Sequence, residues 1–263
     1  MPEPLSTTAG GVKLASLLLE EAEKQGLIDK LKTYFKRKPR ILLLGSTGVG
    51  KSQFLRSLVQ AHPEPIARGD RTIFTSSQVL LVRKSPFRFV DPPGDASDAM
   101  KDVRSDKIRE GMSARGGISG VINVVSYGYH EYDVAKKDVF LPDGKVDPQY
   151  LARHRQFEID QLSEWTALLG SPKTIKWLIT LVTKADLWRN DRDSVRQHYQ
   201  TGDYNRALGD ALSVNTRVLL YSSVFFKFYA EAPLSGYFDE NDRRILAEQF
   251  VKALLASLLE REV

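Results

Sequence analysis

The chain has 263 residues and a formal net charge of +5, and 42% of its residues are hydrophobic and 27% are charged. These proportions are ordinary for a globular domain, and the absence of cysteine excludes disulfides, thiolate metal sites and cysteine nucleophiles. No stretch approaches the roughly 20 apolar residues of a membrane-spanning helix, so we expect a cytoplasmic protein without a transmembrane segment. The basic excess permits an acidic partner, but no pattern in the sequence supports a nucleic acid.

The first 38 residues are expected to differ from the rest of the chain. Residues 1–11 are rich in Pro, Ser, Thr and Gly and are predicted to form a flexible tail. Apolar residues then recur at helical spacing, so residues 12–38 are predicted to form an N-terminal helical extension that Gly26 interrupts. Residues 39–263 are assigned to one domain, and we expect the extension to pack against it.

From residue 39 onward, short apolar runs alternate with helical patterns. The strands that we expect are 41–44, 79–82, 87–90, 121–125, 177–182 and 218–221. The main helices that we expect are 52–59, 148–169, 191–212 and 241–259. This alternation predicts a three-layer α/β fold with a mainly parallel central sheet. Ligands of such sheets bind outside the carboxyl ends of the strands, and each motif below follows a strand.

The strongest motif follows the predicted strand 41–44 and matches the Gly-x4-Gly-Lys-Ser/Thr pattern of a phosphate-binding loop between a strand and a helix. Its residues are Gly45, Ser46, Thr47, Gly48, Val49, Gly50, Lys51 and Ser52. The glycines let successive backbone N–H groups point at phosphate oxygens. Lys51 is predicted to contact the β and γ phosphates, and the Ser52 hydroxyl is predicted to bind Mg2+. The motif therefore indicates a P-loop protein that binds a nucleoside triphosphate.

A second motif, Asp91-Pro-Pro-Gly94, ends the predicted strand 87–90. Asp91 is predicted to hold Mg2+ through water, and the backbone N–H of Gly94 is predicted to contact the γ phosphate. An Asp-Pro pair alone is more typical of an ordinary turn. Its place after a phosphate loop and an apolar strand favours the metal site.

A third motif, Thr183-Lys184-Ala185-Asp186, follows the predicted strand 177–182. With this motif, the chain resembles Ras-like P-loop GTPases of the translation-factor-related class between Pro39 and Phe228. Members of that class share a phosphate loop, a switch threonine, Asp-x-x-Gly, Asn/Thr-Lys-x-Asp and a final Ser-Ala-like motif. Candidates for all five occur here in the same order. The resemblance implies binding of GTP and GDP with Mg2+, hydrolysis of GTP, and switch loops that respond to the bound nucleotide.

The resemblance also implies how guanine is recognised. Asp186 would accept hydrogen bonds from guanine N1–H and the 2-amino group, whereas adenine has no donor at N1, which disfavours an ATP-using enzyme. Lys184 would pack its stem along the base and tie this loop to the phosphate loop. Thr183 departs from the more common Asn, a change that could loosen guanine affinity. Ser222 and Ser223, after the final strand, are candidates for the loop that contacts guanine O6.

Three catalytic residues are implied by the resemblance. They are Lys51, the switch threonine and the residue directly after Asp-x-x-Gly. Thr72 is the candidate switch threonine and would bind Mg2+ through its hydroxyl, with Thr75 as its competitor. Asp95 stands where many relatives have a Gln that orients the attacking water. A carboxylate beside a triphosphate is electrostatically unfavourable, so we expect slow hydrolysis.

Two further features leave alternatives open. Arg104, Arg109 and Arg115 could each approach the γ phosphate, although a solvated position is the more common state of an arginine. The segment 127–148 is longer than a minimal GTPase needs. It is either a partner-facing insertion or a loop that packs on the domain.

The sequence therefore predicts a GTP-binding protein that hydrolyses GTP slowly and signals its nucleotide state to a protein partner through its switch loops. One alternative is a dynamin-like or immunity-type GTPase that self-association activates. Another is a GTP-binding module with negligible turnover.

Overall fold

The protein is described by a computed structural model over residues 10–58, 88–92, 98–131, 135–169, 175–211, 214–223, 228–230 and 238–259. The predicted strand 79–82 and nearly all of the predicted tail lie outside these ranges. None of the helices within them has the length and apolar character that a membrane crossing requires.

The core of the fold is a five-stranded sheet in the order β2-β1-β3-β4-β5, in which every neighbouring pair is parallel. The strands are β1 (Arg40–Leu44), β2 (Arg88–Val90), β3 (Ile118–Val125), β4 (Trp177–Val182) and β5 (Asn215–Leu220). The prediction of a mainly parallel central sheet is confirmed. The three strands in the middle of the sheet are almost wholly buried, which explains why they appear in the sequence as continuous apolar runs.

Helices cover both faces of this sheet. They are α1 (Gly10–Lys24), α2 (Ile28–Lys36), α3 (Lys51–Ser57), α4 (Asp98–Ser113), α5 (Pro148–Leu169), α6 (Arg192–Gln200), α7 (Asp203–Ala211) and α8 (Glu240–Leu259). The prediction of one helix over 191–212 is wrong, because the chain turns at Thr201 and Gly202 between α6 and α7. The N–H of Gly202 donates to Gln197 O at 2.8 Å. A Cβ at Gly202 would lie only 2.7 Å from His198 O, so the turn has room only for glycine.

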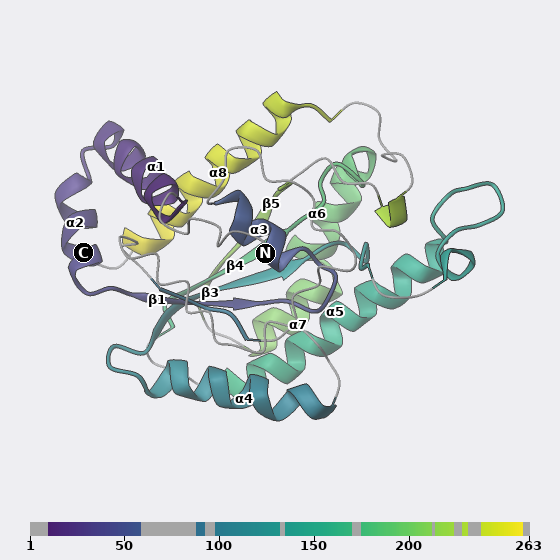
Figure 1. The fold of residues 1–263 in the computed structure, drawn as a ribbon, viewed down its shortest axis with the longest axis horizontal. Helices are drawn as coiled ribbons and strands as arrows, with labels where there is room; N and C mark the ends of the chain where they lie inside the picture. The colour runs from purple at the N-terminus through teal and green to yellow at the C-terminus, as the bar shows by residue number, and fades with distance from the viewer. Residues whose placement is uncertain are drawn as a thin grey trace, which may run out of the picture.

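Alternation along the strands divides the core into two layers. Leu42 and Leu44 of β1 pack in a cluster with residues of α4, α5, α6 and α7. Ile41 and Leu43, which point to the other face, pack with residues of α1, α2, α3 and most of α8. Figure 1 shows α1 and α8 side by side on one face of the sheet, with α4 and α5 on the opposite face. The three-layer α/β fold is confirmed.

The N-terminal helices belong to this core. Leu18 of α1 and Leu31 of α2 are fully buried in the same apolar cluster as Phe250 and Leu254 of α8. Gly26, with φ of +69°, separates α1 from α2, as the helical spacing predicts. The N-terminal helices therefore pack against the sheet through α8, in agreement with the expected packing.

Candidate functional site

The loops that follow the five parallel strands all emerge at the same edge of the sheet. They begin at Gly45 after β1, Asp91 after β2, Ser126 after β3, Thr183 after β4 and Tyr221 after β5. Four of these five loops carry residues that the sequence assigned to a nucleotide site. The fold thus brings the predicted motifs to one place, although they are spread over more than half of the chain.

The phosphate loop, residues 45–52, is shaped by glycine. Gly48 has φ of +80°, and a Cβ there would lie 2.6 Å from both N and O of Glu131. Gly45 has φ of +142°, and its Cβ would lie 2.6 Å from Val124 O. Both positions therefore combine a left-handed backbone with a close approach of another backbone segment, and only glycine satisfies both.

Lys51 is the first residue of α3, and its side chain lies back along the phosphate loop. Its Nζ donates to Gly45 O at 2.9 Å and to Pro92 O at 3.1 Å, and it lies 3.6 Å from Asp91 Oδ1. Burial lowers the pKa of Lys51, Asp91 counteracts this through its charge, and Arg104 adds to the lowering. An anion bound at the loop would favour the charged form of Lys51, which burial disfavours.

The residues predicted to hold Mg2+ fit a hard cation where the structure describes them. Asp91 Oδ1 is buried, and the Lys51 ammonium faces it from 3.6 Å, beyond hydrogen-bond distance; within the described ranges it accepts no hydrogen bond, so this carboxylate oxygen is suited to a metal-bound water. Ser52 lies beside Lys51 in the first turn of α3. Thr72, its competitor Thr75, Gly94 and Asp95 lie outside the described ranges, and their roles stay predictions.

Thr183 links the Thr183–Asp186 motif to the phosphate loop. Its Oγ1 lies 2.5 Å from Val49 O and 3.0 Å from Val125 O, and a hydroxyl donates its single proton to one of them at a time. The carbonyl of Thr183 in turn accepts a hydrogen bond from Nε1 of Trp188 at 2.8 Å. Thr183 therefore makes the link to the phosphate loop through the hydroxyl of its short side chain.

Lys184 extends the same link. Its backbone is left-handed, with φ of +58°, and Nζ donates to Gly48 O at 2.8 Å and to Tyr129 O at 2.7 Å. The ammonium group also lies 5.6 Å from the ring centroid of Phe228. The predicted tie between Lys184 and the phosphate loop is thus present in the geometry, and the contact with Tyr129 joins a third loop to it.

Asp186 is buried beside the loop that follows β5. Ser222 donates its hydroxyl hydrogen to Asp186 Oδ1 at 2.9 Å, and the N–H of Ala185 donates to Tyr221 O at 3.1 Å. Ser223 is also buried. The two motifs that were expected to surround guanine therefore lie in direct contact, and Ser222 orients the carboxylate.

The three candidate arginines lie in different environments. Arg104 on α4 is fully buried, and its Nη2 donates to Glu164 Oε1 at 2.6 Å. Arg109 and Arg115 are exposed. The expectation of a solvated position is therefore wrong for Arg104, because α5 supplies a carboxylate that satisfies its charge inside the protein.

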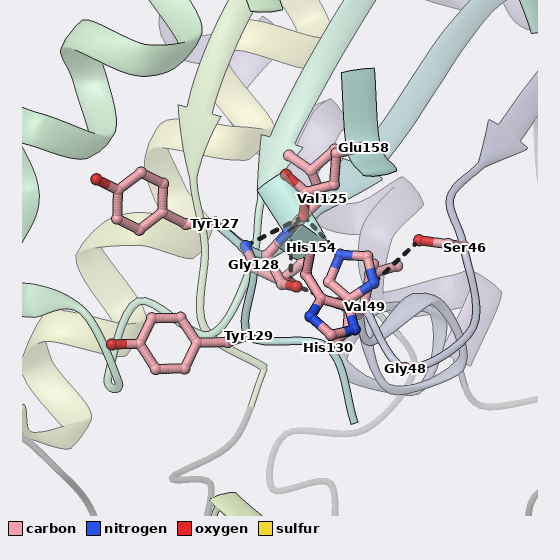
Figure 2. Close-up of polar contacts among 12 residues, drawn as sticks. Ser46, Gly48, Val49, Val125, Tyr127, Gly128, Tyr129, His130, His154 and Glu158 are labelled. Atoms are coloured by element: carbon pink, nitrogen blue, oxygen red, sulfur yellow. Dashed lines mark hydrogen bonds and ion pairs between the residues drawn. The ribbon is translucent and has the colours of Figure 1, made fainter. Parts of the chain in front are cut away.

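Residues 126–131, which we call the wall segment, lie against the phosphate loop and were not recognised as part of the site. His130 Nε2 lies 2.8 Å from Glu158 Oε1 on α5, and His130 Nδ1 lies 3.5 Å from Ser46 Oγ (Figure 2). The sequence held one signal for this arrangement. Glu158 shares a helical stripe with apolar residues of α5, among them Tyr150, Leu162 and Trp165, and a carboxylate on a buried stripe needs partners.

The predicted insertion 127–148 divides into two parts. Tyr129 and His130 in its first part are buried, whereas residues 141–145 are exposed and project from the protein before α5 (Figure 1). A turn closes this projection, with the N–H of Leu141 donating to Lys145 O at 2.8 Å. The first part of the insertion therefore packs on the domain, which was one of the two alternatives, whereas residues 141–145 are exposed to solvent.

Several solved structures are similar to this chain. A GTP-binding protein from Sulfolobus solfataricus in complex with GDP is 14% identical, with 96% of this chain and 68% of that chain covered and a TM-score of 0.41. Toc33 from Arabidopsis thaliana is 14% identical, with 97% of each chain covered and a TM-score of 0.43. The Sar1 small COPII coat GTPase from Encephalitozoon cuniculi in complex with GDP is 14% identical, with 96% and 94% covered and a TM-score of 0.37.

At this identity and these TM-scores, no residue role or activity transfers from those proteins to this chain. No protein-family model and no curated protein sequence matches it.

Proposed function

We propose that this chain binds GTP and GDP and hydrolyses GTP slowly, at the site formed by the phosphate loop and the loops after β4 and β5. The observation that carries the proposal is the double role of the Thr183–Asp186 motif. Lys184 Nζ donates to Gly48 O within the phosphate loop, while Asp186, two residues further on, is held by Ser222. One short segment would thereby set the distance between the phosphates and the base of a bound nucleotide.

The charges of the site suit a nucleotide. Lys51 is held at the phosphate loop by Gly45 O and Pro92 O, so its ammonium group lies at the loop that would receive the β and γ phosphates. Mg2+, held by Ser52, Asp91 and the switch threonine Thr72, would neutralise the charge that develops on the phosphate oxygens. The buried carboxylate of Asp186 would be satisfied by the two donors of guanine and left unpaired by adenine.

Three features support the proposal that hydrolysis is slow. Arg104 donates a hydrogen bond to Glu164. Arg109 on α4 and Arg115 just after it are both exposed. Asp95, in the position of the usual Gln, would orient water poorly beside a triphosphate. We therefore propose that a protein partner, or a second copy of the chain acting through the switch loops, accelerates the reaction in the cytoplasm.

Calorimetric titration of the nucleotide-free protein with GTP, GDP and ATP in the presence of Mg2+ tests this function. Binding of GTP and GDP without binding of ATP is the expected result. Equal or tighter binding of ATP would show that Asp186 does not read the base, and the function would then be that of a general P-loop nucleotidase.

Phosphate release under multiple turnover separates the remaining alternatives. A specific activity that is low and independent of protein concentration supports a slow GTPase that waits for a partner. An activity that rises with protein concentration supports the self-associating class. Tight GTP binding without measurable phosphate release would leave a GTP-binding module.

A further inference from the structure

The wall segment, residues 126–131, forms the back of the phosphate loop. Backbone atoms of Glu131 approach Gly48 so closely that a single added Cβ would lie 2.6 Å from them. Lys184 Nζ bridges Gly48 O and Tyr129 O. The Glu131 carboxylate accepts a hydrogen bond from the N–H of Tyr229 at 3.2 Å, which ties the wall segment to residues 228–230. The position of the phosphate loop therefore depends on what holds the wall segment in place.

Glu158 of α5 holds the wall segment from behind. Its Oε1 accepts hydrogen bonds from the N–H of Ser126 at 2.9 Å and of Gly128 at 3.4 Å, and it lies 2.8 Å from His130 Nε2. Tyr199 of α6 donates its hydroxyl hydrogen to the other oxygen, Oε2. The carboxylate thus collects four donors, three of them from the wall segment itself.

These contacts keep Glu158 ionised, although it is almost completely buried. Burial alone would raise the pKa of Glu158, but the hydrogen bond and charge of His130 and the hydrogen bonds of Tyr199 and Ser126 outweigh it, so the pKa is lowered. Oε1 already accepts from two backbone N–H groups, which can only donate, so this oxygen is an acceptor and Nε2 of His130 carries the proton between them. A second hydrogen bond, from Tyr150 OH to His130 O at 2.7 Å, fixes the backbone of the same residue.

With Nε2 committed to Glu158, the other ring nitrogen of His130 faces the phosphate loop. His130 Nδ1 lies 3.5 Å from Ser46 Oγ, and both side chains are buried. A neutral ring accepts the hydroxyl hydrogen of Ser46, and a charged ring donates to the hydroxyl oxygen, so either state of the ring supports the contact. Figure 2 shows the resulting connection from Glu158 through His130 to Ser46.

We infer that His130 is a positioning residue for nucleotide binding, which holds the phosphate loop through Ser46 while Glu158 holds His130. This inference rests on the proposed function, because the ligand that benefits is the diphosphate part of a nucleotide. A loop that is already in its binding conformation loses less conformational freedom when its N–H groups take up phosphate oxygens. GTP and GDP share that diphosphate, so the contact strengthens the binding of both by a similar factor and leaves the rate of the chemical step unchanged.

The test is a double-mutant cycle on Ser46 and His130, with dissociation constants for GDP and GTP measured by calorimetry. Ser46→Ala and His130→Phe should each weaken both nucleotides about five-fold, as expected for the loss of one hydrogen bond. The double variant should be no weaker than the weaker single variant, because both changes remove the same contact. The turnover number of His130→Phe at saturating GTP should stay within about two-fold of the wild-type value, since positioning acts on binding.

Two variants sharpen the cycle. His130→Gln should bind nucleotides almost as tightly as the wild type, because its amide N–H can donate to Glu158 and its oxygen can accept from Ser46. His154→Gln is the matched control, since the His154 ring lies 5.2 Å from the His130 ring, centroid to centroid, while His154 Nδ1 lies 2.8 Å from Tyr150 O on its own helix. Unchanged affinity is expected for this control.

The outcomes distinguish this inference from the proposed function. If the wild type binds GDP and Lys51→Ala does not, but Ser46→Ala binds as tightly as the wild type, the inference fails and the function stands. Losses that multiply in the double variant would also overturn the inference. If the wild type binds no nucleotide, the proposed function fails first. Ser46→Ala alone decides the matter if near-ultraviolet circular dichroism shows that His130→Phe does not fold.

Discussion

The phosphate loop and the wall segment behind it lie in contact, yet they are built in opposite ways. The phosphate loop, residues 45–52, is a contiguous stretch whose shape comes from glycine backbone geometry and from one lysine. The wall segment, residues 126–131, has its shape imposed by side chains of α5 and α6, chiefly Glu158 and Tyr199, through contacts that span 20 to 72 residues of sequence.

This difference explains why only the first region could be recognised in advance. A phosphate loop binds its ligand with backbone N–H groups and needs particular residues at fixed spacing, so it leaves a pattern in the sequence. A buried polar network needs only that each donor and acceptor find a partner in space, and partners from distant segments leave no local pattern. The predictions below test whether the two regions contribute to one site in these different ways.

Lys51→Ala should have the largest effect. Removal of the ammonium group that Gly45 O and Pro92 O hold at the phosphate loop is expected to weaken GTP binding at least about 1,000-fold, below calorimetric detection. The free energy of unfolding, measured in urea, provides the control and should change little by comparison. Unaltered GTP binding in this variant would mean that residues 45–52 do not bind phosphate.

Asp186→Asn should change the base that is recognised. Asparagine still accepts the hydrogen bond from Ser222, so the loop should keep its geometry. We expect GTP affinity to fall about 100-fold, because a carboxylate that accepts two donors is replaced by an amide that mismatches one of them. Xanthosine triphosphate should gain affinity, and competition between the two nucleotides measures the shift. A parallel loss for both nucleotides would indicate a damaged loop and no role for Asp186 in base recognition.

Glu158→Gln should damage the wall segment and thereby the stability of the protein. Replacing an ionised acceptor of four hydrogen bonds by a neutral amide is expected to lower the free energy of unfolding at pH 7 by about 2 kcal/mol. Urea denaturation followed by circular dichroism measures this change. Asp160→Asn, an exposed carboxylate on the same helix, is the control and should shift the value by less than about 0.5 kcal/mol.

The same variant carries a pH dependence whose sign is fixed. The pKa of Glu158 in the folded protein lies below its ordinary value of 4.5. The stability that its ionisation provides is therefore present above about pH 4.5 and is lost as the pH falls through the lower, folded-state pKa. The difference in stability between wild type and Glu158→Gln should shrink over that acidic range. A difference that stayed constant down to the lowest accessible pH would show that Glu158 is not ionised in the folded state.

Thr183→Val should have the smallest effect, since it removes one hydroxyl between the Thr183–Asp186 motif and the phosphate loop. We expect about five-fold weaker binding of GTP and GDP, because Val49 O and Val125 O lose the one neutral donor that they share. Thr183→Asn should bind at least as tightly as the wild type if the amide can span the same gap. A weaker Asn variant would show that the shorter threonine is matched to this phosphate loop. Calorimetry with GDP distinguishes the two results.

Much of the fold followed from the sequence because its signals are local. The run from Trp177 to Val182 is a strand as predicted, and the helix predicted for 148–169 has the same bounds in α5. The error over 191–212 came from Gly202, whose lack of a Cβ allows a tight turn that a helical pattern alone does not reveal. Roles assigned to Thr72 and Asp95 lie outside the described ranges and stay predictions.

The sequence by itself determined the three-layer fold, the phosphate loop and the order of the motifs, because each depends on spacing along the chain or on the backbone freedom of glycine. Only the tertiary structure decided that Arg104 is buried against Glu164, that Ser222 orients Asp186, and that His130 stands between Glu158 and the phosphate loop. Each of these contacts joins residues 28 to 84 positions apart. The physical reason is that a buried charge or polar group must be satisfied, and its partner is selected by proximity in the folded core.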